Sequence, residues 1–522
     1  MEKGITLSFS EDRPEMRELL EFNHQLSDIH GAAGVLSWDR ETYMPNGASQ
    51  ARANQLATLA GIAHRLLVSD ETRQLLDKLT VLKQCAELTH CDVALIRELN
   101  RAYNRVKKVP QQLVENIERT TSEGTEIWQK ARKESDFKLF RGVLKKIVEL
   151  KLKEADCVGY VETPYNLFLD DFEAGLTVNL VDKMFSTLKD ITTDILGKIG
   201  NSDVHIDQSI LKADIPRDKL MAFTEEILKV MDFDFNCGRQ DVSTHPMTIN
   251  FDPTDVRVTT RFGEQFFTSS IYSSMHEGGH ALYELGVDRT LSRTMLAGGT
   301  SLGIHESQSR LWENYIGRSL EFWRFLYVNV IQIWNETDTK AFPIDFFRAV
   351  NKVEPNLIRV DSDEVTYNLH VILRYEIERD LLEGRIGVDD MPEIWNAKIK
   401  QYLGLEVPDD ARGVLQDVHW SHGSFGYFPT YSLGNLYAAQ LYYVLAKEIG
   451  EAELMDHVSS GNLIPVREWL RDKVHCYGSV FQADELIRKA TGESLNSEYF
   501  RRYLNDKFRS IYQFKDREIE GF

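Results

Sequence analysis

The sequence predicts a mostly α protein, one large helical body with a small β-hairpin in its second half. Apolar residues recur every three to four positions over most of the 522 residues, as they do on helix faces that pack against a core. The alternating period of a strand is found near residue 246. The 13 prolines and 32 glycines are scattered and form no Ser/Gly/Pro-rich linker, so we expect a single domain over residues 1–522.

The first half of the chain is predicted to be a series of helices. Asp12–Ile29 opens with polar capping residues and continues with leucines and a phenylalanine at helical spacing, and Ala51–Leu67 repeats this pattern. Three further segments combine strong helix formers with charges interleaved every three to four positions: Thr80–Arg105, Gln111–Lys133 and Phe137–Glu154. Residues 1–245 are therefore expected to be a helical N-terminal half.

A β-hairpin is predicted directly after this half. Met247–Phe251 and Val256–Phe262 are rich in β-branched residues and alternate in polarity, and the segment between them, Asp252-Pro-Thr-Asp255, is typical of a turn. In the second strand, one face carries Val256, Val258, Thr260 and Phe262, and the other carries Asp255, Arg257, Thr259 and Arg261. One side can therefore be buried while the other stays polar.

The charge of the chain excludes some classes of partner. There are 61 Lys+Arg against 81 Asp+Glu, which gives a formal net charge of −20. Such an excess opposes binding to nucleic acid or to an anionic membrane surface. The N-terminus lacks the features of a signal peptide, no apolar run is long enough to cross a membrane, and the five cysteines have no paired spacing. We therefore expect a cytoplasmic protein.

The segment after the hairpin contains His276-Glu277-Gly-Gly-His280. Residues four apart lie one above the other on a helix, so the two imidazoles can converge on one zinc ion, while Glu277 projects to the adjacent side. A chance H-E-x-x-H arises in about a few per cent of such chains, so the motif alone is a moderate indication. Two glycines inside a helix cost about 1 kcal/mol each, which close approach of another backbone would explain.

A catalytic zinc site usually has three protein ligands. A second helix is predicted after the Gly-Gly turn at residues 298–299, and it carries Glu306, 26 residues beyond His280. Glu306 is the expected third ligand, which gives a His₂Glu site. His305 is the competing candidate, and Glu313 is a further one, expected to be a surface carboxylate or a partner of a ligand.

This site predicts amide hydrolysis. Zinc acidifies water and polarises a scissile carbonyl, and Glu277 can take a proton from the water and pass it to the leaving amine. The hairpin before the zinc helix can either hold an extended peptide by added-strand hydrogen bonds or simply cover the core. Residues 246–522 are accordingly expected to be the catalytic half.

Five segments resemble, in order, the motifs of the carboxypeptidase Taq family of zinc or cobalt metallocarboxypeptidases. They are Asp255-Val-Arg257-Val-Thr259, His276-Glu-Gly-Gly-His280, His305-Glu306-Ser-Gln308, Ile358-Arg359-Val-Asp-Ser-Asp363 and Gly413-Val-Leu-Gln416-Asp417-Val-His419-Trp420. Ser362 departs from the alanine of the fourth motif and puts nothing catalytic in doubt. Residues 36–45 and 165–173 are also similar to family landmarks, so the resemblance covers essentially the whole chain.

The resemblance implies an almost all-helical subunit with a deep substrate groove, usually a homodimer. It also implies the release of single residues from peptide carboxyl ends with broad preference. One zinc ion per subunit is expected, with Co²⁺ or Mn²⁺ as substitutes, since a His₂Glu site tolerates all three.

An exopeptidase of this kind must recognise a free carboxylate, which a guanidinium can do with two parallel hydrogen bonds. Arg359 is the first candidate, and Asp361 and Asp363 could hold its orientation. The alternative for Arg359 is an ordinary ion pair with those aspartates. Arg257, on the polar face of the hairpin, is the second candidate for the carboxylate.

The stretch from Gln416 to Tyr431 is rich in hydrogen-bond donors and is predicted to be a loop that enters a helix near Thr430. A His followed 12 residues later by a Tyr resembles the arrangement in related helical zinc peptidases. On that resemblance His419 would bind the substrate backbone and Tyr431 would stabilise the oxyanion. Tyr427 could replace Tyr431, and Gln416 could contact the substrate terminus.

The sequence thus predicts a cytoplasmic metallocarboxypeptidase that acts on peptides with a free carboxyl end. Two alternatives stay open. An oligoendopeptidase would use the same zinc site without a carboxylate anchor, and a peptide-binding scaffold would have lost catalysis. The intact set of His276, Glu277, His280 and Glu306 disfavours the scaffold.

Overall fold

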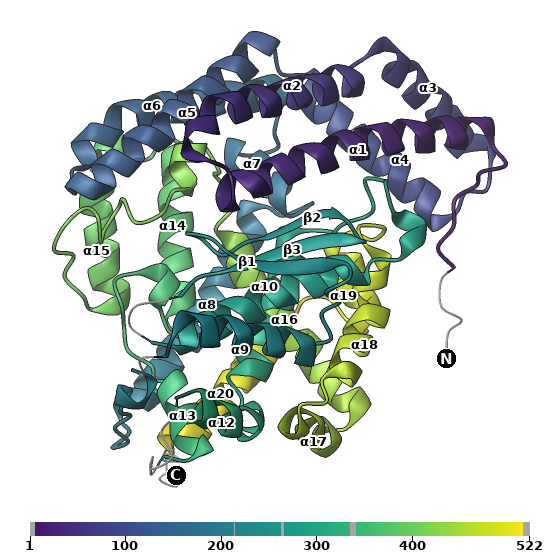
Figure 1. The fold of residues 1–522 in the computed structure, drawn as a ribbon. Coiled ribbons are helices and arrows are strands. Elements are labelled where there is room, and N and C mark those ends of the chain that lie inside the picture. The colour runs from purple at the N-terminus through teal and green to yellow at the C-terminus, as the bar shows by residue number, and fades with distance from the viewer. Residues whose placement is uncertain (1–5, 213–214, 263–265, 335–340, 515–522) are drawn as a thin grey trace, which may run out of the picture. The chain divides into compact units, whose positions relative to one another are not determined.

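A computed structural model describes residues 6–212, 215–262, 266–334 and 341–514. These residues are mainly helical and include one three-stranded sheet, which confirms the predicted fold class (Figure 1). Two compact units are present, one comprising Met1–Lys107, Ser209–Val350 and Leu441–Ser494, the other Lys108–Gln208, Asn351–Gln440 and Leu495–Phe522. Neither unit coincides with the predicted halves, residues 1–245 and 246–522. The single domain and its deep groove stay predictions.

Among the described residues, the first unit contains most of the helices and all three strands of the sheet. Its helices are α1 (Pro14–Thr42), α2 (Ser49–Leu67), α3 (Asp70–Cys85), α4 (His90–Lys107), α9 (Arg217–Val230), α10 (Thr268–Gly286), α11 (Leu302–Arg310), α12 (Leu320–Trp334), α13 (Pro343–Val350), α17 (Glu451–Ser460), α18 (Ile464–Lys473) and α19 (Ala483–Thr491). A π-helical segment, Leu311–Gly317, follows α11 without a break.

The described residues of the second unit form mainly helices. They are α5 (Gln111–Glu134), α6 (Phe137–Val158), α7 (Pro164–Phe172), α8 (Val178–Gly200), α14 (Tyr367–Leu382), α15 (Met391–Leu403) and α20 (Glu498–Tyr512). The long helix α16 (Pro429–Ile449) begins in this unit and ends in the first. The helices predicted at Gln111–Lys133 and Phe137–Glu154 are thus confirmed as α5 and α6.

The first helix is longer than the sequence predicted. It continues through Gly31 and Gly34 to Thr42, although we expected it to end at Ile29. A Cβ on Gly34 would lie 2.7 Å from Cδ1 of Phe251, and one on Gly31 would lie 3.5 Å from the carbonyl oxygen of Phe251. The two glycines therefore let the helix approach the sheet closely, and close packing offsets their low helix propensity.

The helix predicted over Thr80–Arg105 is in fact two helices, because α3 ends at Cys85 and α4 begins at His90. The Thr89 hydroxyl accepts a hydrogen bond from the Asp92 amide at 3.1 Å, and the Asp92 carboxylate accepts one from the Thr89 amide at 3.0 Å. This reciprocal cap satisfies free amides and starts a new helix at this point.

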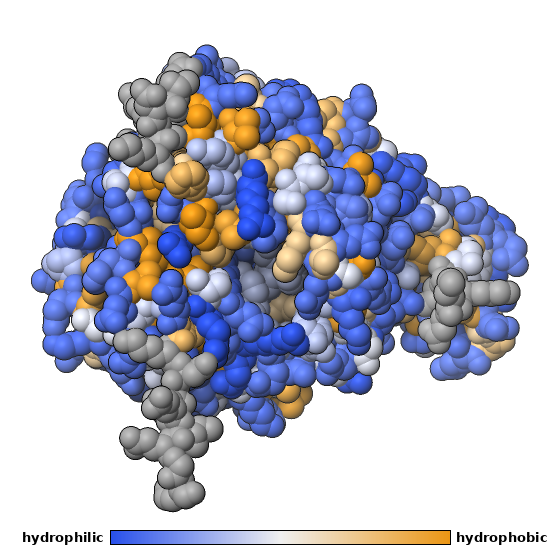
Figure 2. All heavy atoms as spheres, turned by 90° about the horizontal axis from the view of Figure 1, so that it is seen from below, coloured by the Kyte–Doolittle hydropathy of each residue, from blue (hydrophilic) through white to orange (hydrophobic). Residues whose placement is uncertain are grey.

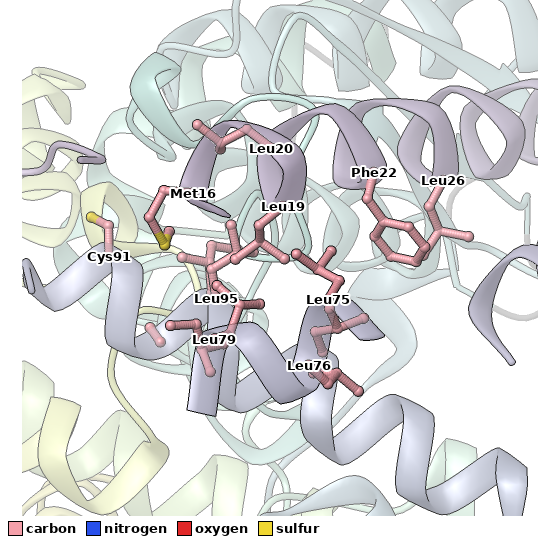
Figure 3. Packing of buried hydrophobic residues seen from close by; sticks show 14 of the residues in the cluster. Met16, Leu19, Leu20, Phe22, Leu26, Leu75, Leu76, Leu79, Cys91 and Leu95 are labelled. Atoms are coloured by element: carbon pink, nitrogen blue, oxygen red, sulfur yellow. The ribbon is translucent and has the colours of Figure 1, made fainter. Parts of the chain in front are cut away.

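Apolar side chains of α1, α3 and α4 form a core of the first unit (Figure 3). Met16 and Leu19 point from α1 toward Leu79 and Leu95, and each of these four side chains is almost completely buried. The leucines and phenylalanine that predicted the first helix are therefore the residues that pack this core.

The sheet has the strand order β1 (Gly238–Val242), β3 (Asp255–Thr260), β2 (Thr248–Asp252). β2 and β3 pair antiparallel, which confirms the predicted hairpin, and β1 adds in parallel to the other edge of β3. The sequence analysis missed β1 because its residues, Gly-Arg-Gln-Asp-Val, show neither alternation nor an apolar run.

The two faces of the sheet contact different helices. Thr260 of β3 accepts a hydrogen bond from Ser274 of α10 at 3.0 Å, whereas Arg257 lies over the Trp38 ring of α1 at 4.7 Å. The predicted inner residues Val256, Val258 and Thr260 are buried, and Phe262 lies beyond the end of the strand. The sheet is thus held between α1 and α10 (Figure 1).

No helix in the described parts of the chain combines the length and the apolar character needed to cross a bilayer. The face shown in Figure 2 is mainly hydrophilic, with hydrophobic residues gathered in patches between the polar ones. This distribution agrees with the charged composition of the chain.

Candidate metal centre

His276 and His280 lie one turn apart on α10 and face Glu306 of α11. Nε2 of His276 is 3.6 Å, and Nε2 of His280 is 3.4 Å, from Oε2 of Glu306. The three side chains can offer ligand atoms that all lie within 4.8 Å of one another. A tetrahedral zinc ion with bonds of about 2.0–2.1 Å keeps its ligand atoms about 3.3–3.4 Å apart. The observed spacing therefore fits such an ion.

The second ring nitrogen of each histidine is bound by a neighbouring side chain. Nδ1 of His276 is 3.0 Å from a Glu313 carboxylate oxygen, and Nδ1 of His280 is 2.6 Å from Nδ1 of His305. His305 in turn lies 2.6 Å from Glu284 through Nε2. Because a carboxylate can only accept, this network assigns the Nδ1 proton to both His276 and His280. The Nε2 lone pairs of both are left for a metal.

These contacts separate the three candidates for the third ligand. Glu306 faces both Nε2 atoms, while His305 and Glu313 each contact the far side of one histidine. Glu313 is buried rather than on the surface, and it also accepts a hydrogen bond from Arg318 at 2.9 Å.

Charge around Glu306 keeps it ionised. Its second oxygen accepts a hydrogen bond from Arg310 at 2.7 Å. Burial opposes ionisation, but Arg310 and the two histidines outweigh it and hold the pKa of Glu306 well below its usual range. Burial lowers the pKa of His280 to about 3, so this imidazole is neutral at physiological pH, as metal ligation requires.

Glu277, between the two histidines in sequence, is buried and is held by the sheet. The hydroxyl of Thr248 on β2 donates to the Glu277 carboxylate at 2.7 Å and lies 3.0 Å from the Glu277 backbone carbonyl oxygen. Burial raises the pKa of Glu277 despite this hydrogen bond, which makes the carboxylate a better proton acceptor.

The two glycines of the motif have different surroundings. A Cβ on Gly279 would lie 2.7 Å from both the Gln308 carbonyl oxygen and the Ser309 Cα, so the backbone of α11 occupies that space. A Cβ on Gly278 would instead meet side-chain atoms of Leu228 and Met231 at 2.7 and 2.9 Å. The expected close approach of another backbone is found at Gly279, and the backbone is that of the helix carrying Glu306.

Arg359 is buried in the second unit and pairs with Asp417. Its Nε and Nη2 donate to one Asp417 oxygen at 3.2 and 2.8 Å, and its Nη1 donates to the Tyr367 hydroxyl at 2.8 Å. We expected Asp363 to orient Arg359. Instead, Asp363 accepts hydrogen bonds from Thr366 at the start of α14.

Gln416 is fully engaged with this cluster. Its carbonyl oxygen accepts from the Arg359 amide at 3.0 Å and from Arg374 at 2.7 Å, and its amide nitrogen donates to three backbone carbonyls. Arg374 also donates to the second oxygen of Asp417 at 2.7 Å. Two buried arginines therefore share one carboxylate, and Gln416 orients both.

His419 lies beside both tyrosine candidates. Its Nε2 is 3.3 Å from the Tyr431 hydroxyl, and its ring centroid is 5.1 Å from that of Tyr427. Burial lowers the pKa of His419 to about 3, so the ring is neutral. A short 3₁₀ helix, His419–His422, interrupts the predicted loop, and α16 begins at Pro429, close to the helix start predicted near Thr430.

Arg257 points to the sheet face covered by α1. Its Nη2 lies 2.7 Å from the Asp255 carboxylate, and its guanidinium lies over the rings of Trp38 and Phe251 at 4.7 and 4.9 Å. These neighbours occupy much of its surface.

Several residues around the metal centre were not foreseen. The most important are Thr248, Asn250 and Glu284. Asn250 of β2 donates to Glu284, which binds His305. The regular spacing of His276, His280 and Glu284 on one helix face could have indicated Glu284. The contacts of Thr248 and Asn250 depend on tertiary structure and left no comparable pattern.

The comparisons with known proteins agree with these observations. A family model described as carboxypeptidase Taq (M32) metallopeptidase matches residues 18–508. The chain belongs to this family. Carboxypeptidase 1 of Bacillus subtilis (strain 168) is 35% identical over 95% of this chain and 98% of its own length. Thermostable carboxypeptidase 1 of Pyrococcus furiosus is 37% identical over 94% of this chain and 98% of its own length.

Solved M32 structures show the same fold. The M32 carboxypeptidase from Deinococcus radiodurans R1 has a TM-score of 0.91 and 32% identity, covering 96% of this chain and all of that one. Trypanosoma cruzi metallocarboxypeptidase 1 has a TM-score of 0.88 and 35% identity, covering 94% and 99%. The M32 chain is thus a metal-dependent carboxypeptidase, as predicted, and the endopeptidase alternative is not favoured.

Proposed function

We propose that His276, His280 and Glu306 hold one zinc ion per subunit and that Glu277 is the general base of peptide hydrolysis. The observation that carries this proposal is the pair of Nε2 atoms aimed at one Glu306 oxygen, with both Nδ1 protons bound elsewhere. When bound, zinc polarises the scissile carbonyl and acidifies water, and Co²⁺ or Mn²⁺ can substitute.

Glu277 would take a proton from the attacking water and deliver it to the leaving amine. Its buried position and raised pKa suit the first step, because an ordinary carboxylate is a weak base at neutral pH. Thr248 restricts the rotation of this carboxylate through the hydrogen bond to Oε2.

Arg359 is the proposed anchor for the substrate carboxylate. Each terminal nitrogen uses one hydrogen in its bonds to Tyr367 and Asp417, so one hydrogen on each is left for two parallel bonds to a carboxylate. Arg257 is the second candidate: like Arg359 it pairs with a carboxylate and lies over aromatic rings, and its side chain is the more exposed of the two.

His419 is proposed to bind the substrate backbone, and Tyr431 or Tyr427 to donate a hydrogen bond to the oxyanion. The neutral ring of His419 and its contact with the Tyr431 hydroxyl support this assignment. For Gln416 we propose a positioning role instead of substrate contact, since its amide is used by Arg359 and Arg374.

The matched pair Arg359→Ala and Arg257→Ala tests the anchor. With peptides that have a free carboxyl end, we expect Arg359→Ala to lower kcat/KM by about 100-fold, the loss typical of one charge-assisted bidentate contact. C-terminally amidated peptides should lose much less, and Arg257→Ala should stay near wild type on both. Equal losses on free and amidated peptides would make Arg359 a structural residue.

We further propose that the enzyme is a cytoplasmic homodimer that degrades short peptides with broad preference. The odd number of unpaired cysteines and the family resemblance support this proposal. The measured mass of the native particle in solution tests the dimer, and a mass of one subunit would contradict it.

A further inference from the structure

Glu378 is a fully buried carboxylate on α14 that the proposed chemistry does not use. It accepts hydrogen bonds from the Tyr165 hydroxyl at 2.6 Å, from the Trp420 indole nitrogen at 2.8 Å and from the Gly426 amide at 2.9 Å. All three donors are neutral. Burying a carboxylate against neutral donors costs free energy, so its presence calls for a reason.

Two of these donors, at the ends of the segment Trp420–Gly426, are direct sequence neighbours of proposed catalytic side chains. Trp420 directly follows His419, and Gly426 directly precedes Tyr427. One oxygen of Glu378 accepts from Trp420 and the other from Gly426, so the carboxylate ties the two ends of the segment together.

The backbone at Gly426 leaves little freedom for this arrangement. Gly426 has φ +88°, and a Cβ there would lie 2.5 Å from the Phe168 carbonyl oxygen. Its amide is therefore fixed in direction by α7, and an acceptor has to be brought to it.

The same helix also carries Arg374, one of the two buried arginines that share the Asp417 carboxylate. Arg374 lies one turn before Glu378 on α14 and binds both Gln416 and Asp417. Along α14, Arg374 and then Glu378 thus contact successive parts of the segment from Gln416 to Gly426.

We propose that Glu378 is a positioning residue that sets the placement of His419 and Tyr427 through Trp420 and Gly426. This inference rests on the proposed roles of His419 and Tyr427. A carboxylate is needed because three donors converge on its two oxygens, and a glutamine would turn its NH₂ group toward either the Trp420 or the Gly426 N–H.

The test compares Glu378→Gln with Glu376→Gln. Glu376 lies on the same helix, is also buried, and binds Lys189, Lys398 and Tyr402. We expect Glu378→Gln to lower kcat by about 10- to 100-fold, as misplacement of catalytic groups does, with metal content and cooperative unfolding retained. Glu376→Gln should keep wild-type kcat within about twofold. Wild-type kcat in folded Glu378→Gln, or equal losses in both variants, would overturn the proposal.

His419→Ala, alone and combined with Glu378→Gln, separates this proposal from the one on which it rests. If Glu378 acts through the segment, adding Glu378→Gln to His419→Ala should cost much less kcat than it costs in the wild type. Full additivity would overturn the role of Glu378. Wild-type kcat in His419→Ala would instead refute the proposed role of His419.

Tyr165→Phe provides a milder variant in case Glu378→Gln does not fold. It removes one donor to the carboxylate and leaves Trp420 and Gly426 in place. We expect a folded enzyme with a several-fold lower kcat and an unchanged metal content, and an unaltered kcat would count against the proposal.

Discussion

The close packing of α10 against α11 predicts the effect of one added methyl group. In Gly279→Ala the new Cβ would lie 2.7 Å from the backbone of α11, whereas ordinary contact begins at 3.4 Å. The two helices must therefore separate by about 0.7 Å, because backbone cannot rotate away as a side chain can.

This displacement should lower both the free energy of unfolding and the affinity for the metal, and the affinity more strongly. Overpacking destabilises by about 1–3 kcal/mol, and the better helix propensity of alanine returns about 1 kcal/mol. Glu306 is on the displaced helix and lies 3.4 and 3.6 Å from the two histidine nitrogens. Metal ligands tolerate errors of about 0.2 Å, so we expect zinc affinity to fall by about 10- to 100-fold.

Gly278→Ala is the matched control, since its neighbours are the ends of the Leu228 and Met231 side chains, which can rotate. Competition with a chromophoric chelator would measure zinc affinity, and denaturant unfolding of the metal-free proteins would measure stability. Wild-type zinc affinity in Gly279→Ala, or the same loss in both variants, would refute the reasoning.

Three further predictions concern proton chemistry. Glu277→Gln should retain zinc and lose at least about 100-fold in kcat, since the ligands survive without the base, and near-normal hydrolysis would remove Glu277 from that role. Thr248→Val should lower kcat by about tenfold at unchanged metal content, because the Glu277 carboxylate loses the hydrogen bond at 2.7 Å that restricts its rotation. An unchanged kcat would show that this hydrogen bond is dispensable. Burial raises the pKa of Glu378 to about 7 from the ordinary 4.5, with Tyr165 and Arg374 opposing the shift, so the folded state holds an extra proton between these pH values. Stability from this group is therefore present below pH 4.5 and is lost as pH rises to 7, by about 3 kcal/mol. Glu378→Gln should remove that part of the pH dependence of the unfolding free energy, and parallel curves for wild type and variant would contradict it.

The sequence predicted those parts of the site that lie close together along the chain. His276, Glu277 and His280 share one helix, and their spacing alone fixes which way the side chains point. The hairpin was predicted for the same reason, since alternation and a turn are local patterns. β1 was missed because a parallel strand is recognised by its partner, and its own residues carry little pattern.

Long-range partners could not be predicted in the same way. Asp361 and Asp363 are near Arg359 in sequence, but the carboxylate that binds it is Asp417, 58 residues away. Glu378 and Trp420 are likewise joined only by the fold. Pairing of buried polar groups follows from packing, which a single sequence does not display.

The register of the small hairpin positions two side chains of the proposed catalytic site. Thr248 and Asn250, alternate residues of β2, reach Glu277 and Glu284 of α10. A slip of one residue would turn both away and present Ile249 and Phe251 to the two carboxylates. Insertions or deletions in the turn between β2 and β3 would therefore act as active-site mutations, although they would change no residue that contacts metal or substrate.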